Sequence, residues 1–169
     1  MAEFRKILIA NRGEIAIRVM RAANEMGKST VAIFAEEDKL SLHRFKADEA
    51  YKIGEGLGPV ASYLNIKEII SVAKKAEVDA IHPGYGLLSE KPEFAKECGL
   101  AGIKFIGPTA ESMEKLGNKA NARKIAKKAG VPVIPASNIL PDNPEELVEI
   151  AKKIGFPIML KASWGGGGR

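Results

Sequence analysis

Short apolar runs alternate along the chain with segments in which apolar residues recur every three or four positions. This pattern predicts β-strands alternating with amphipathic helices, which is typical of a mostly parallel sheet covered by helices. The expected strands are Ile7–Ala10, Thr30–Phe34, Glu49–Ile53, Asp79–His82 and Lys104–Ile106. We therefore predict an α/β fold built on a doubly wound, mostly parallel sheet of the Rossmann-like kind.

Three helices are expected between these strands. The first stops at Gly27, and its apolar positions are Ile15, Val19, Ala22 and Met26. The second begins at the capping residue Asn65, and its apolar positions are Ile66, Ile69, Ile70 and Ala73. The third is the short segment Pro92–Leu100.

The organisation changes after about residue 115. A basic helix at 118–129 ends at Gly130 and leads into the proline-bounded segment Val131–Pro135. Asn143 then caps another helix that closes at Gly155, and Pro157–Lys161 predicts a strand. We expect one domain at residues 1–115, a basic helix and linker at 116–134, and a second domain at 135–169. Because the chain ends on four glycines and an arginine, the second domain is expected to be incomplete.

Composition narrows the class of protein. Hydrophobic residues make up 46% of the 169 positions, yet no apolar run approaches the ~20 residues of a membrane span. The single cysteine, Cys98, excludes a disulfide framework and indicates a reducing compartment. The first residues have neither the apolar core of a signal peptide nor the composition of a transit peptide. We expect a cytoplasmic protein that does not enter a membrane.

The net charge of +5 is concentrated between Lys115 and Lys128, where six basic residues and no acidic one occur. Such a segment either attracts phosphate or nucleic acid, or is simply a solvated helix face. It contains no aromatic residue on which bases could stack. We therefore expect no nucleic-acid partner.

Glycines follow a lysine at the end of the chain, in the segment Lys161–Arg169. Successive glycine amides can approach a polyphosphate without a Cβ in the way, and the lysine adds a positive charge. The spacing matches neither a P-loop nor a dinucleotide-binding fingerprint. The segment is a phosphate-binding loop or, alternatively, a flexible tail or linker.

Two further segments stand at the predicted carboxyl ends of strands, where open α/β sheets bind ligands. The loop His82–Glu90 gathers polar side chains and two glycines, and is either a ligand loop or a structural turn. Asn11–Arg18 either shapes a ligand crevice or begins a helix. With His43 as the second of two histidines, a zinc site is not expected. Cys98 lies on an expected helix, and its side chain is expected to be packed rather than to act as a nucleophile.

In this order along the chain, five motifs resemble the amino-terminal part of biotin carboxylases. They are Ile9–Ala16, His82–Glu90, Phe105–Pro108, Gly117–Lys119 and Lys161–Arg169. Two more segments, Glu36–Glu49 and Ser163–Gly165, are similar to the biotin carboxylase domain of pyruvate carboxylases. The resemblance covers essentially the whole chain.

The resemblance implies a pre-ATP-grasp domain followed by the start of an ATP-grasp domain. In this family ATP and bicarbonate form carboxyphosphate, which carboxylates biotin on a carrier domain, and the enzymes form homo-oligomers. The resemblance further implies ATP-binding roles for Lys119, Lys161, Gly165, Gly166, Gly167 and Gly168. It places Tyr85 and Gly86 near biotin, and Arg18, Arg21 and Glu25 in a dimer contact.

Between Gly54 and Ser62 the chain is shorter than the pyruvate carboxylase pattern and closer to the acetyl-CoA carboxylase type. A parent enzyme of that type or another acyl-CoA carboxylase, or a non-catalytic nucleotide-binding module, is therefore the alternative. The family's Mg²⁺-binding carboxylates, bicarbonate-binding arginine and catalytic base all lie beyond Arg169. The resemblance thus assigns no catalytic or metal-binding residue to these 169 positions, and we expect the chain alone to be inactive.

Overall fold

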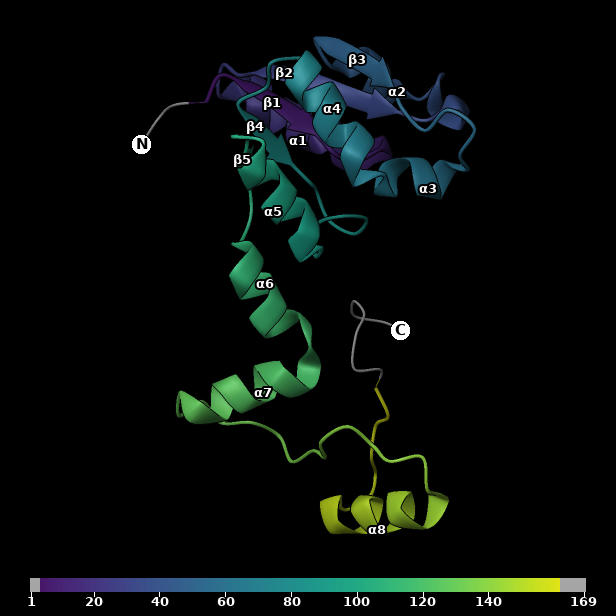
Figure 1. The fold of residues 1–169 in the computed structure, drawn as a ribbon, viewed down its shortest axis with the longest axis vertical. Helices are drawn as coiled ribbons and strands as arrows, with labels where there is room; N and C mark the ends of the chain where they lie inside the picture. Colours follow the sequence, from purple (N-terminus) through teal and green to yellow (C-terminus); the bar gives the residue numbers. More distant parts are fainter. Residues whose placement is uncertain (1–3, 162–169) are drawn as a thin grey trace. The chain divides into compact units, whose positions relative to one another are not determined.

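The computed structural model describes residues 4–161 (Figure 1). The chain divides into two compact units, one ending at Ala110 and the other beginning at Glu111. Each unit is described by itself. Within residues 4–161 no helix is long and apolar enough to cross a membrane.

The first unit is built on a five-stranded sheet in the order β3-β2-β1-β4-β5, and every neighbouring pair is parallel. The strands are β1 (Lys6–Ile9), β2 (Ser29–Phe34), β3 (Glu49–Lys52), β4 (Ala80–His82) and β5 (Lys104–Phe105). All five expected strands are confirmed, each to within one residue at either end. The order, which runs outward from β1 in both directions, confirms the doubly wound sheet.

Five helices and one 3-10 turn connect the strands of this unit. They are α1 (Gly13–Glu25), the 3-10 turn η1 (Glu36–Asp38), α2 (Leu42–Lys46), α3 (Pro59–Leu64), α4 (Ile66–Lys75) and α5 (Pro92–Leu100). Helix α1 packs on α2, and α4 packs on α5. Right-handed crossovers in this strand order place these two pairs on opposite faces of the sheet. The short helices α2 and α3 were not expected, because five or six residues are too few to show a helical period.

The core forms where α1 lies on the central strands. Ala16 and Met20 of α1 pack against Ile9 and Ala32, and Ala23 packs against Ile7 and Ala80. The predicted stripe of α1 was wrong in part: Val19 is half-buried and packs against this core, but Ala22 and Met26 are exposed. The small side chains of Ala16 and Ala23 let the helix approach the sheet closely. In α4 the expected residues Ile69, Ile70 and Ala73 are buried, and the Asn65 side chain accepts a hydrogen bond from the Glu68 N–H.

Strand β1 marks the point at which the winding of the sheet reverses. It pairs with β2 on one side and with β4 on the other, with Ile9 opposite His82. Beyond the last pair, the Ala10 N–H donates to the His82 carbonyl at 2.9 Å. The segments that leave β1 and β4, beginning at Asn11 and Pro83, therefore start side by side at the carboxyl edge of the sheet.

The second unit contains most of α6 (Ala110–Gly117), together with α7 (Lys119–Lys128) and α8 (Pro144–Ile154). The Asn118 side chain caps α7 by accepting from the Asn121 N–H at 3.0 Å, and Asn143 caps α8 by accepting from the Glu145 N–H at 2.9 Å. Helices α7 and α8 confirm the two helices expected here. Helix α6 was not expected.

The expected strand Pro157–Lys161 is wrong, because these residues lie in neither a strand nor a helix. A strand is held by hydrogen bonds to a neighbouring strand. The described part of the second unit, residues 111–161, contains no strand that could pair with it. An apolar sequence that favours extended backbone does not form a strand without such a partner.

Candidate ligand edge of the parallel sheet

Asn11 joins the two segments that leave the sheet at its central edge. The residue is buried, with 1% of its surface exposed. Its side-chain N–H₂ donates to the Pro83 carbonyl at 2.7 Å and to the Tyr85 carbonyl at 3.0 Å, and its Oδ1 accepts from the Arg12 N–H at 2.9 Å. One amide thus ties the loop after β4 to the start of α1.

The loop that follows β4 depends on glycine. Gly84 and Gly86 have φ angles of +66° and +67°, in the region that glycine adopts without strain. A Cβ on Gly84 would lie 2.5 Å from Asn11 Nδ2 and 2.8 Å from Ile15 Cγ2, so the loop fits closely on the start of α1. Between the two glycines Tyr85 is 66% exposed. The loop is therefore a rigid turn that presents an aromatic side chain outward.

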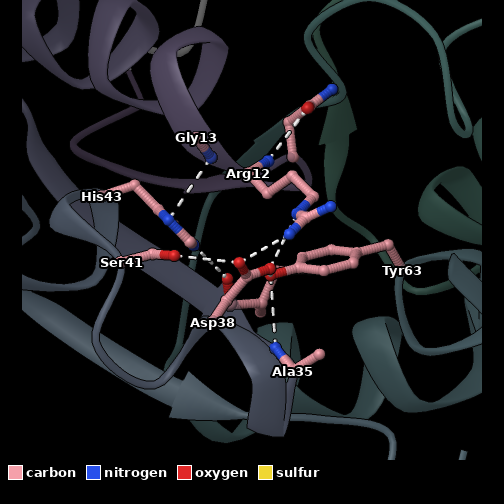
Figure 2. A network of polar contacts seen from close by, with 9 residues as sticks. Arg12, Gly13, Ala35, Asp38, Ser41, His43 and Tyr63 are labelled. Atoms are coloured by element: carbon pink, nitrogen blue, oxygen red, sulfur yellow. Dashed lines mark hydrogen bonds and ion pairs between the residues drawn. The ribbon is translucent and has the colours of Figure 1, made fainter. Parts of the chain in front are cut away.

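Asp38 is the centre of a second polar network, which involves the residues that follow β1 and β2 (Figure 2). Arg12 Nε donates to its Oδ2 at 2.7 Å, and Arg12 Nη2 donates to its Oδ1 at 2.6 Å. The Tyr63 hydroxyl donates to Oδ2 at 2.7 Å, and the Ser41 hydroxyl donates to Oδ1 at 2.9 Å. The Ala35 N–H in turn donates to the Tyr63 oxygen at 3.2 Å. The network connects residues that follow β1 and β2 with the helix α3.

The network fixes the charge of its members. Burial alone would raise the pKa of the Asp38 carboxyl, but hydrogen bonds from Arg12, Tyr63 and Ser41 lower that pKa to about 2. Burial, together with the hydrogen bond to Asp38, raises the pKa of Tyr63. Asp38 is therefore ionised and Tyr63 neutral across the physiological range.

Arg12 is held along the Nε–Nη2 edge of its guanidinium and is otherwise partly open to solvent. Its side chain is 45% exposed, whereas that of Asp38 is 6% exposed. Its guanidinium also lies over the Tyr63 ring, 5.6 Å from the ring centre. The pair fixes a cation at the carboxyl edge of the sheet, where it can contact an anionic group from solvent.

His43 is a structural residue of the same edge. It is fully buried, its Nε2–H donates to the Ile33 carbonyl at 3.1 Å, and its Nδ1 accepts from the Gly13 N–H at 3.4 Å. These partners fix the neutral tautomer, because a carbonyl only accepts and an amide N–H only donates. Burial lowers the pKa of the ring. The histidine thus satisfies the first N–H of α1. The described residues contain no group of three or more metal-ligating side chains.

The other predicted residues belong to α1 and to the second unit. Arg18, Arg21 and Glu25 are exposed on α1, at spacings that place them on one face. In the second unit Lys119 is half-buried at the first position of α7, and Lys161 is exposed after α8. Gly165, Gly166, Gly167 and Gly168 lie outside the described residues.

Cys98 is buried in α5, and burial raises the pKa of its thiol to about 12. This confirms that the residue is packed rather than nucleophilic.

Sequence reasoning missed the network around Asp38. Asp38 comes four residues after the end of β2 and Arg12 comes three residues after β1, and the carboxyl ends of parallel neighbours meet at one edge. That placement was a usable signal for the ion pair. No comparable signal pointed to Tyr63, which reaches the network from a helix of six residues.

Comparison with known proteins agrees with this architecture. Residues 3–113 match the family described as "Biotin carboxylase, N-terminal domain". Residues 118–169 match "Carbamoyl-phosphate synthase L chain, ATP binding domain". The chain belongs to the biotin carboxylase family.

Individual members of the family match over the whole chain. The pyruvate carboxylase of Staphylococcus aureus is 56% identical over 169 residues, which are 100% of this chain and 15% of that protein. A pyruvate carboxylase variant from Rhizobium etli, solved with acetyl coenzyme A, has a TM-score of 0.90 at 60% identity and covers 99% of this chain and 15% of its own. The biotin carboxylase domain dimer of the 2-oxoglutarate carboxylase from Hydrogenobacter thermophilus was solved with MgADP, ADP and bicarbonate. It has a TM-score of 0.93 at 48% identity, over 100% of this chain and 37% of its own.

The chain therefore spans about 15% of the length of the pyruvate carboxylases that it matches.

Proposed function

We propose that the chain is the amino-terminal part of an ATP-dependent biotin carboxylase, and that the complete enzyme is a pyruvate carboxylase. The complete enzyme would use ATP and bicarbonate to carboxylate biotin on a carrier domain. The observation that carries the proposal is the 56% identity to a pyruvate carboxylase over the whole of this chain. The alternative parent, an acyl-CoA carboxylase, differs in the acceptor of the carboxyl group.

Lys119 and Lys161, with the glycines Gly165–Gly168, would hold the phosphates of ATP. The donor set fits a polyphosphate, because ammonium groups and glycine amides are hydrogen-bond donors and carry positive or partly positive charge. Lys119 also stands in the first turn of the ten-residue helix α7, where the helix dipole favours an anion. The exposed Lys124, Lys127 and Lys128 further along α7 would remain in solvent.

The complete reaction also requires Mg²⁺, which would neutralise the negative charge of the phosphates during phosphoryl transfer. We place its ligands in polypeptide beyond Arg169, because the chain spans only 15% of the related Staphylococcus aureus pyruvate carboxylase. The 169-residue chain would accordingly bind nucleotide weakly and catalyse no turnover.

The loop with Tyr85 and Gly86 would lie against biotin. It follows β4 at the point where the winding of the sheet reverses, which is where doubly wound sheets bind ligands. Its exposed tyrosine offers an apolar ring to the bicyclic biotin ring system. The biotinylated carrier domain would deliver its cofactor to this edge.

The exposed face of α1 with Arg18, Arg21 and Glu25 would contact a second copy of the protein. A two-fold axis brings the same patch of both copies together, so a face with both charge signs can pair with itself. The related Hydrogenobacter domain was solved as a dimer. We further place the protein in the cytoplasm, because its one cysteine suits a reducing compartment.

The proposal is tested by measuring carboxyl transfer by the complete polypeptide of which these residues are a part. With labelled bicarbonate, ATP and Mg²⁺, the label is expected to enter free biotin and, when the carrier is present, pyruvate. Label that enters acetyl-CoA instead would identify the alternative parent enzyme. A complete polypeptide that incorporates no label into biotin would contradict the proposal.

A further inference from the structure

We infer that Asn11 is a positioning residue for biotin, because its buried amide fixes the peptide that joins Tyr85 to Gly86. This inference rests on the proposed function of the loop after β4. Asn11 itself follows β1, and its contacts reach residues more than 70 positions away in the sequence.

Every hydrogen-bonding group of the Asn11 side chain has a partner. Its two N–H groups serve the carbonyls of Pro83 and Tyr85, on either side of Gly84, and its oxygen accepts from the Arg12 N–H. Such a fully satisfied buried amide leaves the loop few alternative positions. The far side of the loop is anchored by Leu88, which is 2% exposed.

The hydrogen bond to Tyr85 orients the next N–H of the chain. In a trans peptide the C=O and N–H groups point in opposite directions. When the Tyr85 carbonyl points at Asn11, the N–H of Gly86 points away from it. The exposed Gly86 thereby presents a fixed donor to a ligand acceptor such as the ureido oxygen of biotin.

Gly84 provides an independent way to disturb the same arrangement. A methyl group there would lie 2.5 Å from Asn11 Nδ2, and the φ of +66° disfavours any side chain. Gly84→Ala must therefore push the loop away from Asn11. Asn11→Asp instead keeps the oxygen that accepts from the Arg12 N–H. Its second carboxylate oxygen replaces the N–H₂ group, so the carbonyls of Pro83 and Tyr85 lose their donor and meet an acceptor.

Both variants are tested in the complete polypeptide. The KM for free biotin is expected to rise at least ten-fold in each, with the KM for ATP within two-fold of the wild-type value. Gly56→Ala is the control for Gly84→Ala, because Gly56 also has a positive φ of +74° but no atom within 4 Å of a new Cβ. Asn65→Asp is the control for Asn11→Asp, since its oxygen still caps α4 while its other side-chain group likewise changes from a donor, here to Glu68 Oε2, into an acceptor. Both controls are expected to leave both KM values within two-fold.

A second readout does not depend on activity. In the 169-residue chain, the amide resonances of Tyr85 and Gly86 are expected to shift with Asn11→Asp and with Gly84→Ala, but not with the two controls. Provided that the wild-type enzyme responds to biotin, three results would overturn the inference. They are a KM for biotin that the two variants leave unchanged, an equal rise in the KM values for biotin and ATP, and amide resonances of Tyr85 and Gly86 that do not shift. A wild-type enzyme that does not respond to biotin would instead contradict the proposed function.

Discussion

Arg12 and Asp38 form a two-point ion pair that joins the segments leaving β1 and β2. The Nε–Oδ2 and Nη2–Oδ1 distances are 2.7 and 2.6 Å, and the carboxylate is buried while the guanidinium is half exposed. A bidentate pair fixes the orientation of the arginine as well as its position. The pair therefore contributes both to the stability of the first unit and to the charge at its ligand edge.

Asp38→Asn is expected to lower the free energy of unfolding of the first unit by about 2 kcal/mol. The loss is below the ~3–5 kcal/mol typical of fully buried pairs, because Arg12 remains partly in water. Equilibrium unfolding in urea measures it. Glu37→Gln, one residue away on the exposed side of η1, is the control and is expected to change the free energy by less than about 0.5 kcal/mol. Equal effects of the two substitutions would contradict the role given to Asp38.

The same pair predicts a dependence on pH. The pKa of Asp38 is about 2 in the folded chain and 3.8 for the free group, so folding favours the ionised form. A lowered folded pKa gives stability that is complete above the unfolded value and is lost as the pH falls through the folded value. The difference in unfolding free energy between wild type and Asp38→Asn should be constant above about pH 5 and shrink between about pH 4 and 2. A difference that stays constant down to pH 2 would exclude this linkage.

Tyr63→Phe is expected to cost about 1–3 kcal/mol of stability, because it leaves the buried Ala35 N–H without its acceptor. Hydrogen exchange at Ala35 should accelerate more than exchange at Leu8 in the neighbouring strand. Tyr85→Phe removes a hydroxyl from an exposed ring and is the matched control for stability. If both variants unfold at the same urea concentration, the Tyr63 hydroxyl is not the acceptor that holds this turn.

The five strands could be predicted because each is a short apolar run between turn residues, and burial on both faces of a parallel sheet requires such runs. The rotation of α1 about its own axis could not be predicted in the same way. Its sequence holds apolar residues on two adjoining stripes, and only contact with the sheet selects Ala16, Met20 and Ala23. The expected strand at Pro157–Lys161 failed for a related reason, since pairing is a property of the partner as well as of the segment.

The candidate site was accessible from the sequence only in part. The loops after β1 and β4 carry glycines and polar residues where the fold class places ligands, so both could be located. The hydrogen bonds of Asn11 to Pro83 and Tyr85 span more than 70 residues, and local patterns carry no information about such contacts. In the network around Asp38, the placement of Arg12 and Asp38 after neighbouring strands was a usable signal, whereas nothing local pointed to Tyr63 in its helix of six residues.

Gly54→Ala is expected to destabilise the first unit by more than about 2 kcal/mol. Its Cβ would overlap Ser62 Oγ and lie 2.9 Å from the Ser62 Cα, and the φ of +74° is itself unfavourable for alanine. The glycine N–H also donates to the Glu68 carboxylate at 3.0 Å. Thermal and urea unfolding provide the measurement.

Gly56→Ala is the matched control, because Gly56 has the same φ of +74° with open space around it. Its expected cost is about 1–2 kcal/mol, from backbone strain alone. If Gly54→Ala costs no more than Gly56→Ala, the close approach of Gly54 and Ser62 does not constrain the fold.

The most direct test of the account compares the 169-residue chain with the complete polypeptide in one assay, bicarbonate-dependent ATP cleavage stimulated by free biotin. Phosphoryl transfer needs metal-held phosphates and positioned charges, and the chain contributes only part of these. The complete polypeptide is expected to turn over, and the 169-residue chain is expected to show no cleavage above background. Cleavage by the 169-residue chain itself, or no cleavage by the complete polypeptide, would contradict the account.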